Sequence, residues 1–241
     1  MSKIVITGSA SGIGREVAKK LSDSGHEIIS IDLRDADIIA DLSTSEGRQK
    51  AIADTLEKTG SEIDILITAA GMGGHLADGK LVMIVNYFGT VELLDGFFPA
   101  MKGRAGAAAL ALSSNSAQMG VDPENELVKA LLAHDEQAAI DVVGDMPSAA
   151  TYGLSKHAVA RAVRRRAHEW GTAGVRLNAI APGMTETPML QGVRDNPDLK
   201  GALENIPVPL DRTANVDEIA NIIVMMVSEA FSFMHGSVLY V

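Results

Sequence analysis

The chain has 241 residues, of which 46% are hydrophobic and 22% are charged, so it can bury one substantial core and is neither disordered nor fibrous in composition. It contains no cysteine, which excludes disulfides and cysteine-bound zinc and fits a reducing compartment. Its formal net charge of −10 argues against nucleic acid as a partner, because a phosphate backbone must be met by clustered Lys and Arg. A basic cluster at Arg161–Arg166 falls on a predicted helix and indicates a solvated face.

Short apolar runs alternate along the chain with longer segments of helical period. This alternation predicts one α/β domain over residues 1–241, a Rossmann-type, doubly wound parallel sheet flanked by helices. Two stretches, at about 115–150 and 185–213, have no place in the alternation, and long connections of this kind are usually functional. The expected strands are Ile4–Thr7, Glu27–Ile31, Asp64–Thr68, Ala107–Ser113, Val175–Ile180 and Ser237–Val241, and the expected helices are Ile13–Ser22, Glu46–Lys58, Lys80–Met101, Thr151–Trp170 and Val216–Ser228.

The ends and the apolar runs of the chain predict its location. The richest apolar stretch, Ile222–Val227, is far too short to cross a membrane. The first predicted strand follows Met1 so closely that the basic and apolar regions of a signal peptide have no room before it. We therefore expect a cytoplasmic protein with no membrane partner.

A glycine-rich segment, Thr7–Gly14, joins the first predicted strand to the first predicted helix. Gly8 can form the tight turn, Gly12 can let backbone approach a pyrophosphate, and Gly14 can let the helix pack closely on the sheet. The N-terminus of that helix would then present free N–H groups and a partial positive charge to the phosphates. We call Thr7–Gly14 the glycine turn.

The second predicted strand is followed by Asp32, eighteen positions beyond Gly14. A carboxylate at this place can accept hydrogen bonds from the adenosine ribose hydroxyls and repels a 2′-phosphate, which favours NAD over NADP. Arg15 and Arg34 are the counter-argument, since either could reach a 2′-phosphate. We give Asp32 more weight because it lies at the end of the strand.

Tyr152 and Lys156 lie at positions i and i+4 near the start of a predicted helix and share one of its faces. A nearby ammonium favours a phenolate, so Tyr152 could act as an acid and base well below the pKa of roughly 10 of free tyrosine. Ser113-Ser114 ends an intervening strand, where ligands bind in open α/β sheets. A serine hydroxyl at this place could hold a substrate oxygen while Tyr152 transfers the proton.

These motifs, with Pro182-Gly183, resemble the short-chain dehydrogenase/reductase family over essentially the whole chain. The resemblance implies that Lys156 binds the nicotinamide ribose and lowers the pKa of the tyrosine. It also implies that Asn86 holds a water molecule that takes part in a proton relay. Thr68 departs from the family pattern, in which an asparagine supports the central sheet, so we expect a local structural change there with the chemistry retained. The resemblance implies a catalytic tetrad of Asn86, Ser114, Tyr152 and Lys156, and an NAD site formed by Gly8, Ser11, Gly12, Ile13, Gly14, Asp32, Leu33, Asp41, Leu42, Ala69, Ala70, Gly71, Tyr152, Lys156, Pro182, Gly183, Thr185 and Thr187.

The segments Ile31–Ala36, Ile39–Thr44, Val85–Gly89 and Ala173–Asn178 resemble, within that family, the bacterial 3α-hydroxysteroid dehydrogenases/carbonyl reductases. That subgroup implies a hydrophobic, steroid-like or aromatic alcohol or ketone as substrate. Coniferyl-alcohol dehydrogenases are similar to the same subgroup, so an NAD-dependent aromatic or allylic alcohol dehydrogenase is the alternative. A non-catalytic NAD-sensing binding protein is an alternative of another class, and it has no need of the Ser–Tyr–Lys set. Relatives continue beyond the final strand into a short tail, and any substrate contact from such a tail lies outside this sequence.

Ser114 and Tyr152 are 38 positions apart, which is unusually far for the family. The added segment carries apolar residues at roughly helical spacing, so it is either a surface helix packed on its own subunit or a helix that contacts a partner subunit. We expect a homodimer, with a tetramer as the second possibility. The helix-spaced positions are Leu127, Leu131, His134, Ala138 and Val142.

The sequence of residues 187–210 predicts a loop that contains several prolines and flexible apolar side chains. Such a loop suits a lid over an apolar substrate. A buried satellite cluster is the other interpretation of this loop. The histidines show no metal-ligand spacing with carboxylates, so we expect no metal. The apolar residues of the expected lid are Met189, Leu190, Val193, Leu199, Leu203 and Ile206, its prolines are Pro188, Pro197, Pro207 and Pro209, and the histidines considered are His75, His134, His157 and His168.

Overall fold

A computed structural model of the chain describes residues 1–119, 122, 124–204 and 206–241. The described residues form one parallel sheet of seven strands in the order β3-β2-β1-β4-β5-β6-β7. The order reverses direction at β1, which makes the sheet doubly wound and confirms the predicted fold class. The strands are β1 (Lys3–Thr7), β2 (Glu27–Asp32), β3 (Ile38–Ile39), β4 (Ile65–Thr68), β5 (Ala108–Leu112), β6 (Arg176–Ala181) and β7 (Val238–Tyr240).

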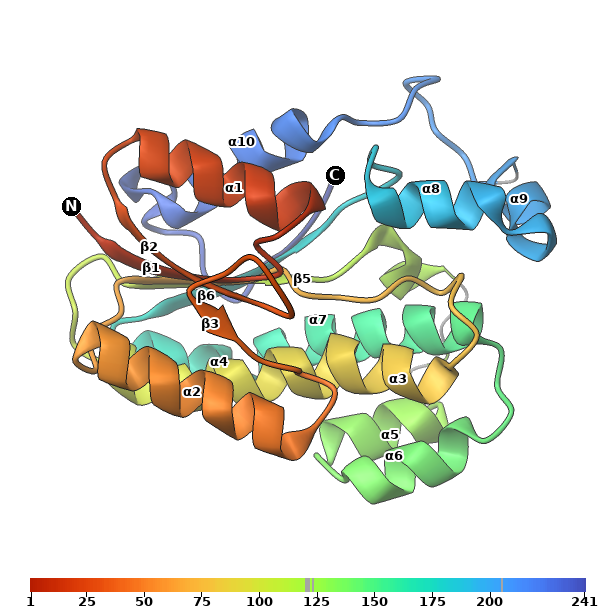
Figure 1. Cartoon of the computed structure of the whole chain (residues 1–241), viewed down its shortest axis with the longest axis horizontal. Coiled ribbons are helices and arrows are strands. Elements are labelled where there is room, and N and C mark those ends of the chain that lie inside the picture. The colour runs from red at the N-terminus through yellow and green to blue at the C-terminus, as the bar shows by residue number, and fades with distance from the viewer. Residues whose placement is uncertain (120–121, 123, 205) are drawn as a thin grey trace.

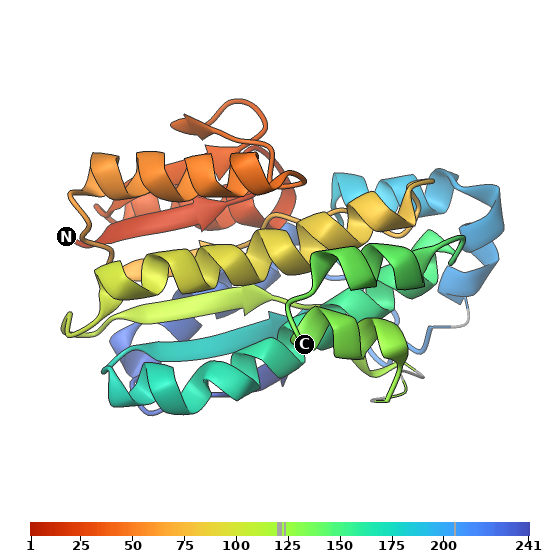
Figure 2. The same cartoon turned by 90° about the horizontal axis from the view of Figure 1, so that it is seen from below.

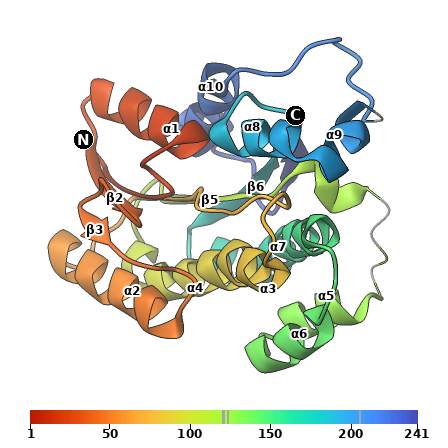
Figure 3. The same cartoon turned by 45° about the vertical axis from the view of Figure 1, so that its right-hand side comes forward.

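Helices cover both faces of the sheet. Figure 1 shows α1 and α10 on one face and α2, α4 and α7 on the other, with α5 and α6 outside that second layer. Figures 2 and 3 show from two further sides that α5 and α6 lie against α3 and α7. The helices are α1 (Gly12–Asp23), α2 (Ser45–Thr59), α3 (Gly79–Met83), η1 (Ile84–Phe88), α4 (Gly89–Met101), η2 (Asn115–Gln118), α5 (Glu126–Leu132), α6 (Glu136–Val143), α7 (Ser148–Thr172), α8 (Pro188–Asp195), α9 (Pro197–Glu204), α10 (Val216–Val227) and η3 (Glu229–Phe231).

Two apolar clusters, one on each face, form the core. Successive residues of a strand point to opposite faces. Accordingly, Ile4 and Ile6 of β1 join the cluster under α1 and α10, whereas Val5 joins the cluster under α2, α4 and α7. All three side chains are fully buried. Because every central strand is covered on both sides, these strands are continuously apolar, which is the pattern that the sequence shows.

The segment Gly79–Met101 runs as one helical rod through α3, η1 and α4. By length and mean hydropathy it could span a membrane, although charged residues interrupt it and it forms no unbroken apolar run. However, 67% of its most apolar window is buried within the protein, and it packs under the sheet. Its apolarity is therefore that of a core helix, and the sequence argument looked only for unbroken apolar runs.

The inserted segment forms two helices instead of the single helical stripe that we expected. The chain turns between α5 and α6 at His134, which has a left-handed φ of 59°. His134 and Val142 are exposed, and the buried positions of α6 are Ala139 and Val143. Leu127 and Leu131 are fully buried, as a core-facing helix requires. α5 packs on α7 of the same chain, so these apolar residues contact their own subunit. Residues 120, 121 and 123 of the insertion lie outside the described residues.

The expected lid is mostly helical. The sequence interpretation took residues 187–210 as a loop because of its four prolines, but Pro188 and Pro197 each stand at the first position of a helix, where a missing N–H costs nothing. Thr187 caps α8 by accepting a hydrogen bond from the Leu190 N–H at 3.2 Å. Residue 205 lies outside the described residues.

Candidate active site

A cavity of about 610 Å3 opens at the carboxyl ends of the strands, where a doubly wound sheet binds its ligands. Every residue predicted for the cofactor site lines this cavity, and so do Ser114, Tyr152 and Lys156. The six apolar residues of the expected lid, Met189, Leu190, Val193, Leu199, Leu203 and Ile206, line it too. The structure thus brings together segments that lie up to 198 positions apart in the sequence, from Gly8 to Ile206.

The glycine turn has no space for a side chain at Gly8 or at Gly14. Gly8 has a φ of +71°, and a Cβ built on it would lie 2.6 Å from the Ala70 nitrogen. A Cβ on Gly14 would lie 2.2 Å from the Gly8 carbonyl oxygen, so α1 packs directly on the turn. Ser11, at the N-cap of α1, makes no side-chain capping bond, which leaves the helix N-terminus open to the cavity. Free N–H groups at a cavity suit a pyrophosphate, so the chain fits a dinucleotide here.

Asp32 connects the end of β2 to the glycine turn. Its carboxylate accepts hydrogen bonds from the Ala10 N–H at 2.9 Å and from the Leu33 N–H at 2.7 Å. The side chain therefore orders the turn and also lines the cavity. Arg15 and Arg34, which could have met a 2′-phosphate, are exposed and do not line the cavity.

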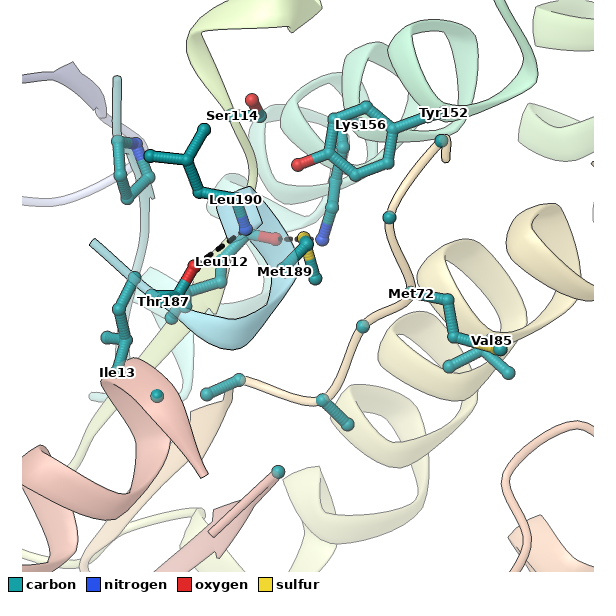
Figure 4. A pocket seen from close by; sticks show the side chains of 18 of the residues that line it. Ile13, Met72, Val85, Leu112, Ser114, Tyr152, Lys156, Thr187, Met189 and Leu190 are labelled. Carbon is teal, nitrogen blue, oxygen red and sulfur yellow. Dashed lines mark hydrogen bonds between the residues drawn. The ribbon is translucent and has the colours of Figure 1, made fainter. Parts of the chain in front are cut away.

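Ser114 and Tyr152 stand side by side on the cavity wall, one at the end of β5 and the other in the first turns of α7 (Figure 4). The Ser114 hydroxyl is held by Ser116, whose hydroxyl lies 3.0 Å away. Burial raises the pKa of Tyr152, and a hydrogen bond with Ser114 acts in the opposite direction. Ser113, the neighbouring residue, donates to the Lys156 carbonyl at 2.8 Å and so fixes α7 to the end of β5.

Lys156 runs beside Tyr152 but ends on the main chain (Figure 4). Its nitrogen donates to the Leu112 carbonyl at 2.9 Å and lies 6.0 Å from the centre of the Tyr152 ring. Burial lowers the pKa of Lys156 to about 8. In the chain by itself, burial of the phenol outweighs the hydrogen bond with Ser114, so the pKa of Tyr152 lies above that of free tyrosine. That Lys156 lowers this pKa in the complex with cofactor stays a prediction.

Asn86 does not line the cavity. It is fully buried in the π-helical turn η1, where its side chain both accepts from the Met72 N–H at 2.9 Å and donates to the Met72 carbonyl at 3.0 Å. It therefore fixes from behind the loop that follows β4, and Met72 and its neighbours form the wall. A π-helical turn adds a residue to the helix, and such turns recur at functional sites.

Sequence reasoning missed several residues of the cavity wall. Met72, Met119 and Met184 add flexible side chains to the apolar part, and Ser116 adds a hydroxyl beside Ser114. Met184 and Ser116 each lie within two positions of a predicted site residue, so their place in the sequence was a usable signal. Thr68, which departs from the family pattern, is buried, and its hydroxyl has no hydrogen-bond partner within the described part of the chain.

No group of three or more His, Asp or Glu side chains that could hold a metal occurs among residues 1–119, 122, 124–204 and 206–241. Of the histidines considered from the sequence, His75 lies against α8, His134 lies beside Glu92, and His157 contacts the Ala117 carbonyl. His168 is exposed on α7. These four histidines therefore lie at different places in the fold.

A doubly wound sheet, an open glycine turn and a Ser–Tyr–Lys group at one cavity define a dinucleotide-dependent oxidoreductase. The comparisons with known proteins agree. Residues 2–124 match the model of the short-chain dehydrogenase family, and residues 137–241 match a model described as enoyl-(acyl carrier protein) reductase. The chain belongs to the short-chain dehydrogenase/reductase family.

Three relatives bear on the substrate. The chain is 44% identical to the 3-alpha-hydroxysteroid dehydrogenase/carbonyl reductase of Comamonas testosteroni, over 98% of this chain and 93% of that protein. It superposes with a TM-score of 0.97 and 41% identity on the crystal structure of the 3-alpha-hydroxysteroid dehydrogenase of Pseudomonas sp. B-0831 complexed with NADH, covering 100% of this chain and 95% of that one. It is 31% identical to a coniferyl-alcohol dehydrogenase of Pseudomonas, over 97% of this chain and 92% of that protein.

Proposed function

We propose that this enzyme is an NAD(H)-dependent 3α-hydroxysteroid dehydrogenase/carbonyl reductase. The observation that carries the proposal is one cavity with a polar end and an apolar end, joined at Ser114, Tyr152 and Lys156. The polar end is formed by the glycine turn and Asp32, and the apolar end by methionine and leucine side chains. The similarity to the Comamonas and Pseudomonas hydroxysteroid dehydrogenases over nearly the whole chain supports this substrate class.

The proton chemistry falls to Tyr152. Bound NAD supplies the acceptor of a hydride from the alcohol carbon, or, when reduced, its donor. Ser114 holds the substrate oxygen by its hydroxyl, which Ser116 keeps in place. Tyr152 takes the alcohol proton during oxidation and returns it during ketone reduction. Lys156 supplies a buried amine next to the phenol, and because burial brings its pKa to about 8, its charge changes near working pH.

The binding roles of the other site residues are proposed as follows. The N–H groups of the glycine turn and α1 bind the pyrophosphate, and Asp32 binds the adenosine ribose. Asn86 acts through the Met72 backbone, which it holds by two hydrogen bonds, and this places the loop after β4 under the nicotinamide end of the cavity. α8 and α9 form the lid over the substrate, because their apolar side chains face the cavity.

The experiment that tests the proposal is a substrate panel. Neutral 3α-hydroxysteroids, aromatic ketones and cinnamyl-type alcohols are assayed by NADH absorbance with NAD and with NADP. We expect the highest kcat/KM with a 3α-hydroxysteroid and NAD. A preference for coniferyl-type alcohols would favour the alternative that the 31% identical relative supports. Turnover of no substrate, with NADH still bound, would favour a non-catalytic NAD sensor.

We further propose a cytoplasmic homodimer. The lack of cysteine supports a reducing compartment, and the family's habit of assembling through helices supports association. The inserted helices do not carry this proposal, because their buried apolar residues contact α7 of the same chain. Sedimentation at micromolar concentration measures the mass, and a monomer would contradict the dimer.

A further inference from the structure

Arg48 is a charged residue buried inside the fold. It lies in the first turn of α2 and is 1% exposed, as deeply buried as the aliphatic core. A buried guanidinium is costly unless carboxylates and other acceptors surround it. The position of those acceptors therefore indicates which parts of the molecule Arg48 joins.

Three donor atoms of Arg48 contact three different segments. Nε donates to Glu92 of α4 at 2.8 Å, and Nη2 donates to Glu136 of α6 at 2.5 Å. Nη1 donates to the Leu42 carbonyl at 3.3 Å. The guanidinium also lies 5.8 Å from the centre of the Phe88 ring. Because Glu136 belongs to the insertion and Leu42 lines the cavity, Arg48 connects the inserted segment to the cofactor site.

Leu42 has little freedom to move on its other sides. A Cβ built on Gly89 would lie 3.2 Å from the Leu42 Cβ, so the helix packs tightly against it. A Cβ on Gly47 would lie 1.8 Å from the carbonyl oxygen of Asp41, the residue before Leu42. Asp41 and Leu42 are thus clamped between α2 and α4, and the Leu42 carbonyl is directed to Arg48. A shift of Arg48 would be transmitted to the cavity wall, because closely packed interiors are hard to compress and transmit strain.

We propose that Glu136, through Arg48, positions Leu42 and so sets the affinity for the adenine end of the cofactor. The insertion is then a part of the cofactor site that acts without touching the cofactor. This inference rests on the proposed NAD site. Glu136 and Glu92 share the charge of Arg48, and His134 lies 3.7 Å from Glu92 on the outer side of the group. Neutralising Glu136 leaves a buried donor with a weaker partner, and Arg48 relaxes toward Glu92.

The test compares Glu136→Gln with Glu126→Gln. Glu126 lies on α5 of the same insertion, but its partner is the surface residue Lys129, at 3.1 Å. Binding of NADH is measured by fluorescence and binding of ADP-ribose, which has no nicotinamide, by calorimetry. We expect Glu136→Gln to weaken both by about fivefold, the size of effect that residues without ligand contact produce. Glu126→Gln should match the wild type in both.

A second readout separates positioning from loss of stability. Turnover with reduced nicotinamide mononucleotide, which has no adenine, should be equal in Glu136→Gln and the wild type at a temperature where both are folded. Glu92→Gln, which alters Arg48 from the other side, should reproduce the weaker ADP-ribose binding. The inference would be overturned, and the proposed NAD site kept, if ADP-ribose binding were unchanged in both variants. The same conclusion would follow if turnover with the mononucleotide fell by as much as ADP-ribose binding. A wild type that binds neither NADH nor ADP-ribose would overturn the proposed NAD site together with it.

Discussion

The Lys156 side chain donates to the main-chain carbonyl of Leu112 at 2.9 Å, while the phenol that it is proposed to serve lies beside it. An amine buried to this extent loses its hydration, which lowers the pKa of Lys156 to about 8 from 10.5. The amine that is proposed to take part in the chemistry therefore lowers the stability of the fold while it is charged. This conflict is typical of functional sites, where a local rule is broken for activity.

The Lys156 burial predicts how stability depends on pH. Between about pH 8 and pH 10.5 the unfolded chain binds a proton at Lys156 that the folded chain has lost, so the free energy of unfolding rises with pH in this window. Below pH 8 Lys156 is charged in the folded and in the unfolded chain. Burying this charge then lowers the free energy of unfolding by an amount on the order of 3 kcal/mol, from the size of the pKa shift. Denaturant unfolding of the wild type and Lys156→Met at pH 7 and pH 9.5 measures this. We expect Lys156→Met to gain relative stability at pH 7 and to lose more than half of that gain at pH 9.5, inside the window. Parallel profiles for the two proteins would contradict the burial argument.

Tyr152→Phe tests the proton-transfer role. It keeps the ring in its place and removes the hydroxyl, so kcat should fall by about 10²–10⁴-fold, as is usual for loss of a general acid and base. NADH binding, measured by fluorescence titration, should survive because the glycine turn and Asp32 are unchanged. Turnover near the wild-type rate would show that another group transfers the proton. Loss of NADH binding together with activity would assign the tyrosine a cofactor-holding role instead.

Asp32→Ala tests cofactor choice. The substitution removes the proposed ribose ligand and also the acceptor for the Ala10 and Leu33 N–H groups. We expect kcat/KM with NAD to fall by about 10- to 100-fold, the value of charge-assisted hydrogen bonds, and the preference over NADP to shrink. Asp35→Asn is the matched control: it removes a nearby surface carboxylate, and asparagine tolerates the left-handed φ of 50° at that position. Equal wild-type kcat/KM with the two cofactors would refute the role of Asp32.

The sequence predicted most of the fold because its signals are local. Each predicted strand and helix of the alternation is present, with ends shifted by at most a few residues. The two-residue strand β3 was missed because so short a segment has no period to detect. The two inserted helices were read as one because the break at His134 depends on a backbone conformation that a non-glycine residue seldom adopts.

The site was predicted for a different reason. The glycines and the Tyr–Lys pair have chemically distinctive types and spacings, so their place at the cavity followed from sequence. Asn86 is an exception, since whether an amide faces a cavity or a backbone loop is decided by packing around η1. The direction of the Tyr152 pKa was also beyond the sequence, because it depends on how far the phenol is buried. Arg48 looked like any helix-surface cation, although it is buried among carboxylates from two distant segments.

α8 is docked on the loop after β4 through His75, and this contact predicts how the lid affects substrate binding. A Cβ on Gly192 of α8 would lie 2.4 Å from His75 Nε2, and Asn196 donates to the His75 carbonyl at 3.2 Å. Gly192→Ala must therefore displace the His75 ring or α8, and overpacking of this kind costs about 1–3 kcal/mol.

We expect Gly192→Ala to raise KM for the ketone or alcohol on the order of tenfold, the low-to-middle part of that range, with little change in NADH affinity. The reason is that α8 carries Met189 and Leu190 on the apolar wall, whereas the glycine turn lies on other elements. His75→Ala in the same chain removes the ring that the new methyl group meets, so the double variant should recover most of the wild-type KM. Steady-state kinetics at saturating NADH measure KM, and fluorescence titration measures the cofactor. If the single variant keeps its KM, or if the double variant is no better than the single one, the contact between Gly192 and His75 does not position the lid.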